Sequence, residues 1–250
     1  MTDKALLRPG DPALALGLLT RLPVPVGDAA RGARAAWAWP LAGAVLGGGA
    51  ALIGWAALMA GLPAPVAALL ALGALVMLCG ALHEDGLADT ADGIWGGRTR
   101  ERRLEIMRDS RTGSYGVIAL ALTLGLRAVA LSFLFEAGPG VAAAALVASA
   151  MLSRAAMAGA MAVLPQARET GLAQAQGRPP VATVLLGAGL AAAGAVLLHG
   201  ASGLLAAGAA ALAVLAVARL ARVKIGGQSG DVLGAAQQMA EIAALLCLMP

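Results

Sequence analysis

The sequence predicts an all-α, polytopic integral membrane protein that forms a single domain over residues 1–250. Hydrophobic residues make up 60% of the chain, charged residues only 13% and aromatic residues 3%. A soluble domain is typically about half apolar and a quarter charged. With so few aromatic residues, the spans must pack through small side chains, and the 34 glycines let helix backbones approach closely within lipid.

Apolar runs of about 20 residues, the length that crosses the bilayer core, recur along the chain. The six clearest spans are predicted at 40–60, 64–82, 116–135, 141–164, 181–198 and 201–218. The last apolar run, 232–249, contains Gln237, Gln238 and Glu241. It either crosses as a seventh span or packs along the bundle with its polar face at the site. Residues 10–20 are too short to span, and we interpret them as an interfacial helix.

Basic residues fall in alternate connections between the predicted spans. They precede the first span, fill the segment 83–115, and recur in the fourth and sixth connections. The intervening connections GLPAP, EAGPG and HGASG contain no Lys or Arg. By the positive-inside rule, the N-terminus and the segment 83–115 are predicted to be cytoplasmic, in a multi-pass protein of the cytoplasmic (inner) membrane. The net charge of +4 then reflects topology and contact with anionic lipid, and no nucleic-acid partner is expected.

The strongest local signal is HEDGLADTADG at 83–93, directly after the second predicted span. If the helix continues through this stretch, Asp85, Asp89 and Asp92 share one face within about 60°. Stacked like charges repel, so the face needs a compensating cation. Carboxylate oxygens are hard ligands, and Mg²⁺ is typically held by one or two of them together with substrate phosphates.

A second acidic helix is predicted shortly afterwards. Gly96-Gly97 offers a turn, Thr99 an N-cap, and RERRLEIMRD a short helix with Glu105 and Asp109 one turn apart. Two facing helices of this kind could hold one or two divalent ions. The predicted metal ligands are therefore Asp85, Asp89, Asp92, Glu105 and Asp109, with Mg²⁺ as the cofactor.

A solvated hairpin is the alternative interpretation of this charged segment. Its six arginines could neutralise the acids through surface ion pairs, each worth about 0–1 kcal/mol. Glu84 and Glu101 are better explained as partners of arginine than as metal ligands. Asp85, Asp89 and Asp92 favour the metal interpretation because Gly, Leu, Ala and Thr, not basic residues, separate them.

The arginines of this segment suit a phosphorylated substrate, because guanidinium forks and exposed amides bind phosphoryl oxygens. The turn DSRTGSYG at 109–116 adds hydroxyls, and GGQSGD at 226–231 precedes the last helix, whose N-terminus could receive phosphate. Asp231 would be the N-cap there or a ligand from a third element. The predicted substrate-binding residues are Arg102, Arg103, Arg108, Ser110, Arg111, Thr112, Gly113, Arg154, Gly230 and Asp231. The alternative for the arginines is that they only hold the loop on the cytoplasmic side.

Two arginines, Arg127 and Arg154, fall inside predicted spans, where a charge is costly and usually faces the bundle or water. Neither has an evident acidic partner in its own helix. We interpret Arg154 as a substrate-binding or site-ordering residue and Arg127 as a side chain that snorkels. His83 could assist the site, but a histidine at a membrane boundary is more often structural.

Three segments resemble the cobalamin synthase family, the adenosylcobinamide-GDP ribazoletransferases: HEDGLADTADG, RRLEIMRDSRTGSYG and GGQSGDVLGA. The resemblance runs from TRLPVP at 20–25 to the C-terminal helix. It implies a magnesium-dependent membrane enzyme that joins adenosylcobinamide-GDP to α-ribazole or its 5′-phosphate and releases GMP. It leaves the oligomeric state open, a homo-oligomer included.

A second resemblance concerns the CDP-alcohol phosphotransferases, which use metals between membrane helices to make phospholipids. Asp89-Thr90-Ala91-Asp92-Gly93 matches the start of their motif, but Gly96-Gly97 replaces its Ala-Arg pair and the later acids come too soon. By loose analogy with the last acid of that motif, Asp109 is the predicted general base, and the predicted catalytic residues are Asp109 and Asp92. A transporter or scaffold, the third alternative, predicts charges spread along a path through the bilayer.

Overall fold

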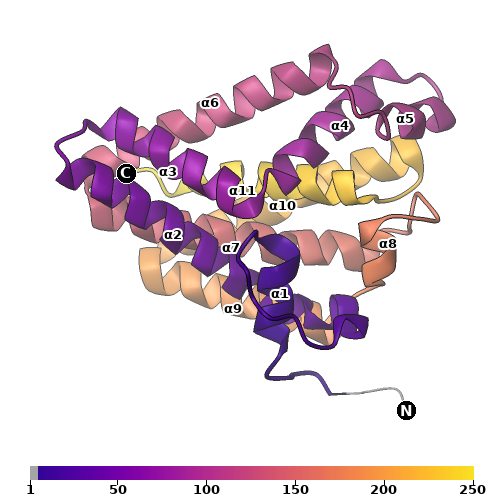
Figure 1. Ribbon diagram of the computed structural model, residues 1–250, viewed down its shortest axis with the longest axis horizontal. Helices are drawn as coiled ribbons and strands as arrows, with labels where there is room; N and C mark the ends of the chain where they lie inside the picture. Colours follow the sequence, from indigo (N-terminus) through magenta and orange to yellow (C-terminus); the bar gives the residue numbers. More distant parts are fainter. Residues whose placement is uncertain (1–4) are drawn as a thin grey trace.

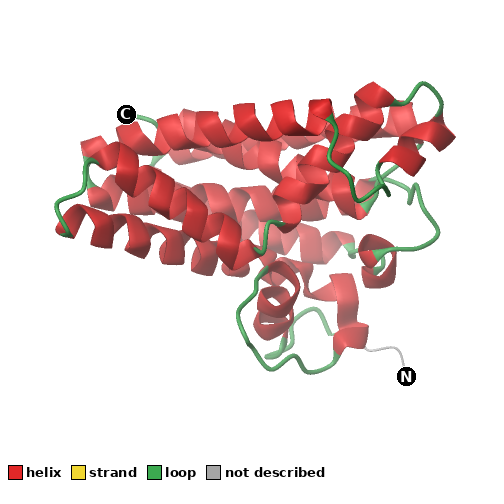
Figure 2. Ribbon diagram, turned by 45° about the horizontal axis from the view of Figure 1, so that its top comes forward, coloured by secondary structure: helices red, strands yellow, loops and turns green. Residues whose placement is uncertain are grey.

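The computed structural model describes residues 5–250 as a bundle of helices with no β-strand in that range (Figures 1 and 2). The elements are α1 (Asp11–Leu19), the 3-10 segment η1 (Ala29–Ala38), α2 (Trp39–Met59), α3 (Ala64–Cys79), α4 (Leu82–Gly96), α5 (Arg100–Ile106), α6 (Ser114–Ala137), α7 (Pro139–Val163), α8 (Leu172–Gln176), α9 (Val181–His199), α10 (Ala201–Ile225) and α11 (Gly230–Cys247). The long helices run roughly along the long axis, and α4 and α5 lie at one end of the bundle (Figure 1). The predicted all-α class is confirmed.

Five helices of the described chain are long and apolar enough to cross a membrane, and a sixth span is added if α3 and α4 count as one. The five are the helical segment Ala29–Met59, α6, α7, α9 and α10. The predicted seventh span, 232–249, is not among them. It forms α11, which packs against α4, α7 and α10 and buries Gln237, Gln238 and Glu241 inside the bundle. The protein is therefore a multi-pass membrane protein whose last helix packs within the bundle and buries a few polar side chains there.

The predicted span 64–82 is shorter than expected, because α3 has 16 residues and covers only about 24 Å at 1.5 Å per residue. Gly80 and Ala81 follow it, both in the left-handed conformation with φ of 70° and 55°. Glycine adopts this conformation easily, whereas Ala81 is the only non-glycine residue with positive φ in the described chain. The chain bends by 88° here, so the expected continuous helix through the acidic stretch is wrong: α4 starts afresh at Leu82.

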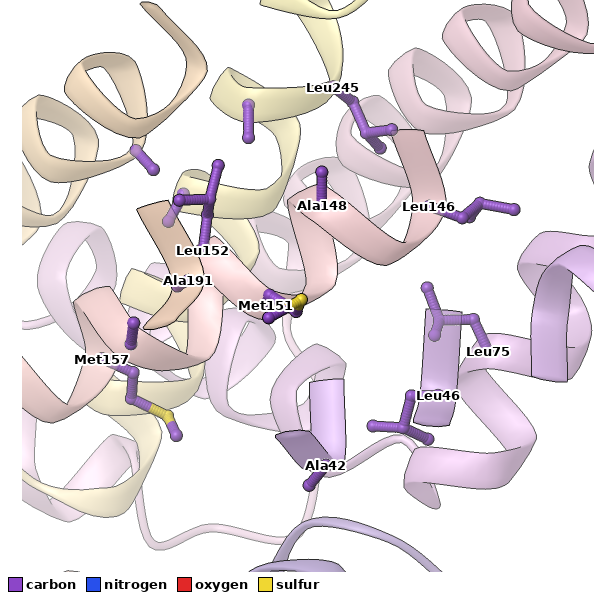
Figure 3. Close-up of a cluster of buried hydrophobic side chains, with 14 of the residues drawn as sticks. Ala42, Leu46, Leu75, Leu146, Ala148, Met151, Leu152, Met157, Ala191 and Leu245 are labelled. Atoms are coloured by element: carbon purple, nitrogen blue, oxygen red, sulfur yellow. The ribbon is translucent and has the colours of Figure 1, made fainter. Parts of the chain in front are cut away.

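The apolar core lies between α2, α3, α7, α9 and α11. Figure 3 shows part of it, with Leu46, Leu75, Leu146 and Leu245 pointing inward among alanines. The contact between α2 and α7 is extensive, and glycines make it possible. A Cβ atom on Gly47 would lie 2.5 Å from the carbonyl oxygen of Leu146, so only glycine fits there.

Two neighbouring glycines of α2 provide a matched test of this packing. We expect Gly47→Ala to destabilise the protein by about 1–3 kcal/mol because the added methyl group must push α2 away from α7. Gly48→Ala meets no atom within 4 Å. It should be neutral or stabilise by up to about 1 kcal/mol, the helix-propensity gain of alanine over glycine. Unfolding of both variants in detergent micelles measures the difference, and equal stabilities would contradict the predicted close approach.

Candidate active site

Helix α4 carries the acids, and close packing against α11 fixes its position. A Cβ on Gly86 would lie 2.8 Å from the backbone oxygen of Asp231, and one on Gly234 would lie 3.2 Å from Cα of His83. The two backbones can approach only because both positions are glycine. This crossing brings the start of α4 beside the N-terminus of α11.

Three acids meet at this crossing. Asp85 is exposed and Asp89 is partly buried one turn further along α4. Asp89 interacts electrostatically with Asp85 and Asp231, and Arg168 is the opposing cation. Arg168 Nη1 lies 2.9 Å from Asp231 Oδ2. The cluster holds more negative than positive charge, which favours a bound cation.

Asp92, the third predicted acid of α4, serves a different contact. It is buried, and its two carboxylate oxygens accept hydrogen bonds from the amides of Gly113 at 2.6 Å and Gly116 at 2.9 Å. These amides belong to the start of α6, where unpaired N–H groups favour negative charge. Asp92 therefore anchors the turn before α6 to α4.

The N-cap of α11 is not the residue that the sequence predicted. Ser229 is the N-cap, since its hydroxyl accepts a hydrogen bond from the amide of Val232 at 3.4 Å. The same hydroxyl donates to Asp231 Oδ2 at 3.2 Å. Burial raises the pKa of Asp231, while the neighbouring Arg168 opposes the rise. The N-cap role predicted for Asp231 is wrong, and its carboxylate instead faces Arg168.

Arg168 is the main residue that the sequence analysis missed. Two backbone hydrogen bonds of 2.8 Å position its loop: the Ala167 amide donates to Gln228, and the Gln228 amide donates to Pro165. They join the α7–α8 connection to the turn before α11. No motif surrounds Arg168, so only this long-range pairing could have identified it.

A cavity of about 270 Å³ opens beside these charges. Its charged lining residues are Asp85, Arg168 and Asp231, and Gly230 and Ser229 also line it. Of the predicted substrate-binding residues, Gly230 and Asp231 therefore line this cavity. One arginine, three acids in or beside the cavity and a helix N-terminus together form a site that suits phosphate oxygens and a cation.

The predicted second acidic helix is shorter than expected. Thr99 is its N-cap as predicted, accepting from the amide of Arg102 at 3.2 Å. However, α5 ends at Ile106, so Asp109 lies in the following turn and not one helical turn from Glu105. Glu105 pairs with Arg102 at 2.8 Å, and its side chain is 68% exposed.

Asp109 pairs with a neighbour in the turn. Arg111 donates to it from both its backbone amide and its guanidinium group, and these hydrogen bonds lower the pKa of Asp109 to about 2. A general base works best with a pKa near the operating pH. The general-base role of Asp109 stays a prediction, which this pairing does not favour.

The remaining predicted substrate-binding residues of the charged segment lie outside the cavity lining. Arg108, Ser110, Arg111, Thr112 and Gly113 are exposed. Arg103 donates to the backbone oxygens of Ile94 and Lys224, which ties α5 to α4 and α10. Glu101 pairs with Arg100 at 3.9 Å, as an arginine partner.

The five predicted metal ligands do not converge on one point. Within residues 5–250, no three His, Cys, Asp or Glu side chains form a group that could hold a metal ion. Magnesium requires fewer protein ligands when substrate phosphates complete its shell, and one or two carboxylates are typical. Asp85 and Asp89 lie one helical turn apart and have few cationic neighbours. They could therefore be the one or two carboxylates that such a magnesium ion needs.

Both arginines of the predicted spans belong to a buried polar network. Arg127 pairs with Glu84 at 3.0 Å and with Glu241 at 2.5 Å, and Arg154 pairs with Glu241 at 3.0 Å. The interpretation that Arg127 snorkels is wrong, because its side chain is 1% exposed. Glu84 is an arginine partner, as expected. The acids come from α4 and α11, so no pattern within α6 or α7 could reveal them.

Comparison with known proteins identifies the family. Residues 11–249 match the family model described as cobalamin-5-phosphate synthase. The adenosylcobinamide-GDP ribazoletransferase of Azorhizobium caulinodans is 50% identical over 94% of this chain and 94% of its own length. The proteins of the same name from Bradyrhizobium diazoefficiens and Brucella canis are 46% and 44% identical, covering 94% and 96% of this chain and 92% and 96% of their own lengths. No solved structure matches. The chain therefore belongs to the cobalamin-5-phosphate synthase family.

Proposed function

We propose that this chain is an adenosylcobinamide-GDP ribazoletransferase, which joins adenosylcobinamide-GDP to α-ribazole or its 5′-phosphate and releases GMP. Relatives of that name match over nearly their whole length. The observation that carries the proposal is that Asp85, Asp231 and Arg168 line one cavity and that Asp89 interacts electrostatically with all three. A CDP-alcohol phosphotransferase is not favoured, because the family match covers residues 11–249 and the motif breaks down after Gly93.

The reaction needs positioning and charge neutralisation more than covalent help from the protein. A ribose hydroxyl oxygen bonds to the phosphorus next to cobinamide and gives up its proton to a general base, the role predicted for Asp109. The bond from that phosphorus to the GMP oxygen breaks, and GMP leaves. Arg168 and the amides at the start of α11 bind phosphoryl oxygens of the diphosphate. Asp231 holds the Arg168 guanidinium group in place. Asp92 keeps the turn at Gly113 against α4.

Asp85 and Asp89 would hold magnesium, since they are the acids near the cavity with the least cationic compensation. Bound magnesium supplies neutralising charge for the diphosphate and for the departing GMP. The roles of Asp92, Glu105 and Asp109 as further ligands stay predictions, as do the catalytic roles of Asp92 and Asp109. So do the substrate contacts of the exposed residues between Arg102 and Gly113.

We also propose a cytoplasmic-membrane location, with the N-terminus and the segment 83–115 on the cytoplasmic side. The alternation of basic and uncharged connections supports this orientation. It places the cavity on the side where nucleotide substrates are available. The bilayer is the expected surrounding medium, and the oligomeric state is open.

Turnover by the purified protein in lipid tests the proposed function. With adenosylcobinamide-GDP, α-ribazole 5′-phosphate and magnesium, we expect a joined corrinoid product and GMP in equal amounts. EDTA should abolish both, and added magnesium should restore them. A folded protein that forms no product would overturn the reaction, whereas full turnover in EDTA would overturn only the metal requirement.

A further inference from the structure

The cavity has an apolar floor that the charges do not explain. Leu19, Trp39, Met157, Met161 and Leu233 line it, and each is at most 6% exposed. They come from α1, α2, α7 and α11, so four helices that are distant in sequence build one apolar surface. Asp85 and Arg168 lie in the lining of the same cavity. The cavity is therefore amphipathic, with an apolar floor and a charged side.

A buried hydrogen-bonded contact holds α1 and η1 together beside this apolar floor. Asp11 of α1 is fully buried and accepts hydrogen bonds from Arg31 at 2.8 Å and from the indole of Trp37 at 2.6 Å. These contacts fix α1 against η1, the segment that leads directly into α2. Leu19 and Trp39 thereby reach the cavity from the two helices that this buried pair holds together.

Size limits what the cavity can hold. A volume of about 270 Å³ lies near the lower end of small-molecule pockets, which span about 300–1,000 Å³. A corrin ring with its side chains is far larger than a single heterocyclic base. The cavity therefore accommodates one base-sized group of the two substrates.

The polarity of the floor decides between the purines of adenosylcobinamide-GDP, adenine and guanine, and the dimethylbenzimidazole of α-ribazole. Guanine and adenine each present several donors and acceptors along their edges, and burying these against leucine and methionine without partners is unfavourable. The dimethylbenzimidazole of α-ribazole presents two methyl groups and one free ring nitrogen. An apolar floor suits this base and disfavours both purines.

One buried polar atom matches that single nitrogen. His83 lines the cavity and is 2% exposed, and its Nε2 has no hydrogen-bond partner in the described structure. Its Nδ1 lies 3.2 Å from Cys79 Sγ. The tautomer in which Nδ1 accepts from the thiol carries its proton on Nε2, a donor for one acceptor nitrogen.

We propose that this cavity is the α-ribazole subsite, with the dimethylbenzimidazole on the apolar floor and the ribose toward Asp85 and Arg168. This inference rests on the proposed function and names the place of one substrate within it. The exposed side chain of Gln174, which also lines the cavity, is available to the ribose hydroxyls, and so is the side-chain oxygen of Gln166, whose amide nitrogen donates to the backbone oxygen of Ala173. The nucleophile would then enter beside the residues that bind the diphosphate.

Two methionines of α7 provide a matched test. Met161 lies in the floor, whereas Met151 is equally a buried methionine of the same helix but does not line the cavity. We expect Met161→Ala to raise the KM for α-ribazole about tenfold through lost apolar contact, with the KM for adenosylcobinamide-GDP within about twofold of the wild type. Met151→Ala should leave both KM values within about twofold. Steady-state kinetics in lipid, varying each substrate in turn, measures all four values.

A substrate analogue tests the same inference without changing the protein. The α-riboside of unsubstituted benzimidazole lacks two methyl groups, and we expect its KM with the wild type to be about tenfold higher than that of α-ribazole. Equal KM values for the two nucleosides would overturn the subsite, as would a Met161→Ala effect confined to adenosylcobinamide-GDP. Equal effects of the two alanine variants would also overturn it. A wild type without any turnover would overturn the proposed function itself, and the subsite with it.

Discussion

Replacing Asp89 by asparagine is expected to lower turnover about 100-fold or more at saturating substrates. Asp89 interacts electrostatically with Asp85 and Asp231, and Arg168 is the cation that opposes them at Asp89. Asparagine preserves the size of the side chain and removes the charge that would hold magnesium on the diphosphate. The rate of GMP release, measured over a range of magnesium concentrations, should show the loss together with a weaker apparent magnesium affinity.

Glu101 provides the control for this experiment. It belongs to the same charged segment, its side chain is 77% exposed, and its nearest basic partner is 3.9 Å away. Glu101→Gln removes the same unit of charge but should change the rate by less than about threefold, since exposed ion pairs contribute little. If Asp89→Asn turned over as fast as Glu101→Gln at every magnesium concentration, the acids of α4 would not act at the reaction centre.

Local sequence patterns predicted the features that depend on a few neighbouring residues. Long apolar runs indicated α6, α7, α9 and α10 because length and composition alone decide whether a helix can cross lipid. Thr99 was identifiable as an N-cap because capping depends on residues only three positions apart. The acidic stretch was recognisable because the family motif is contiguous in the chain.

Features that depend on long-range contacts could not be predicted in the same way. The bend between α3 and α4 requires left-handed backbone at Ala81, which the apolar run around it does not signal. Asp92 belongs to the same motif as Asp89, yet its carboxylate contacts amides 21 and 24 positions away. Arg168 and Asp231 are 63 positions apart in the sequence, and they meet because the loop that carries Arg168 is hydrogen-bonded to the turn before α11.

Among the described residues, Glu241 is the one whose loss should cost the most stability. It is 1% exposed and pairs with both Arg127 and Arg154. We expect Glu241→Ala to destabilise the protein by about 3–5 kcal/mol, because it leaves buried guanidinium charge uncompensated. Chemical unfolding in detergent micelles measures this change. Replacing Arg154 by methionine in the same chain should recover part of the loss, since Glu241 is the acidic partner of Arg154, whereas Arg127 keeps Glu84.

The same network has a role in placing the acids of α4. Because the chain bends by 88° before α4, the apolar packing of α3 does not determine how α4 is rotated. Glu84 fixes that rotation by accepting hydrogen bonds from Arg127 and Gln238, each at 3.0 Å. Asp85 follows Glu84 directly, so its direction depends on this contact. A loss below about 1 kcal/mol in Glu241→Ala would mean that water reaches the network, and the rotation of α4 would then depend on its close packing against α11 and on Asp92.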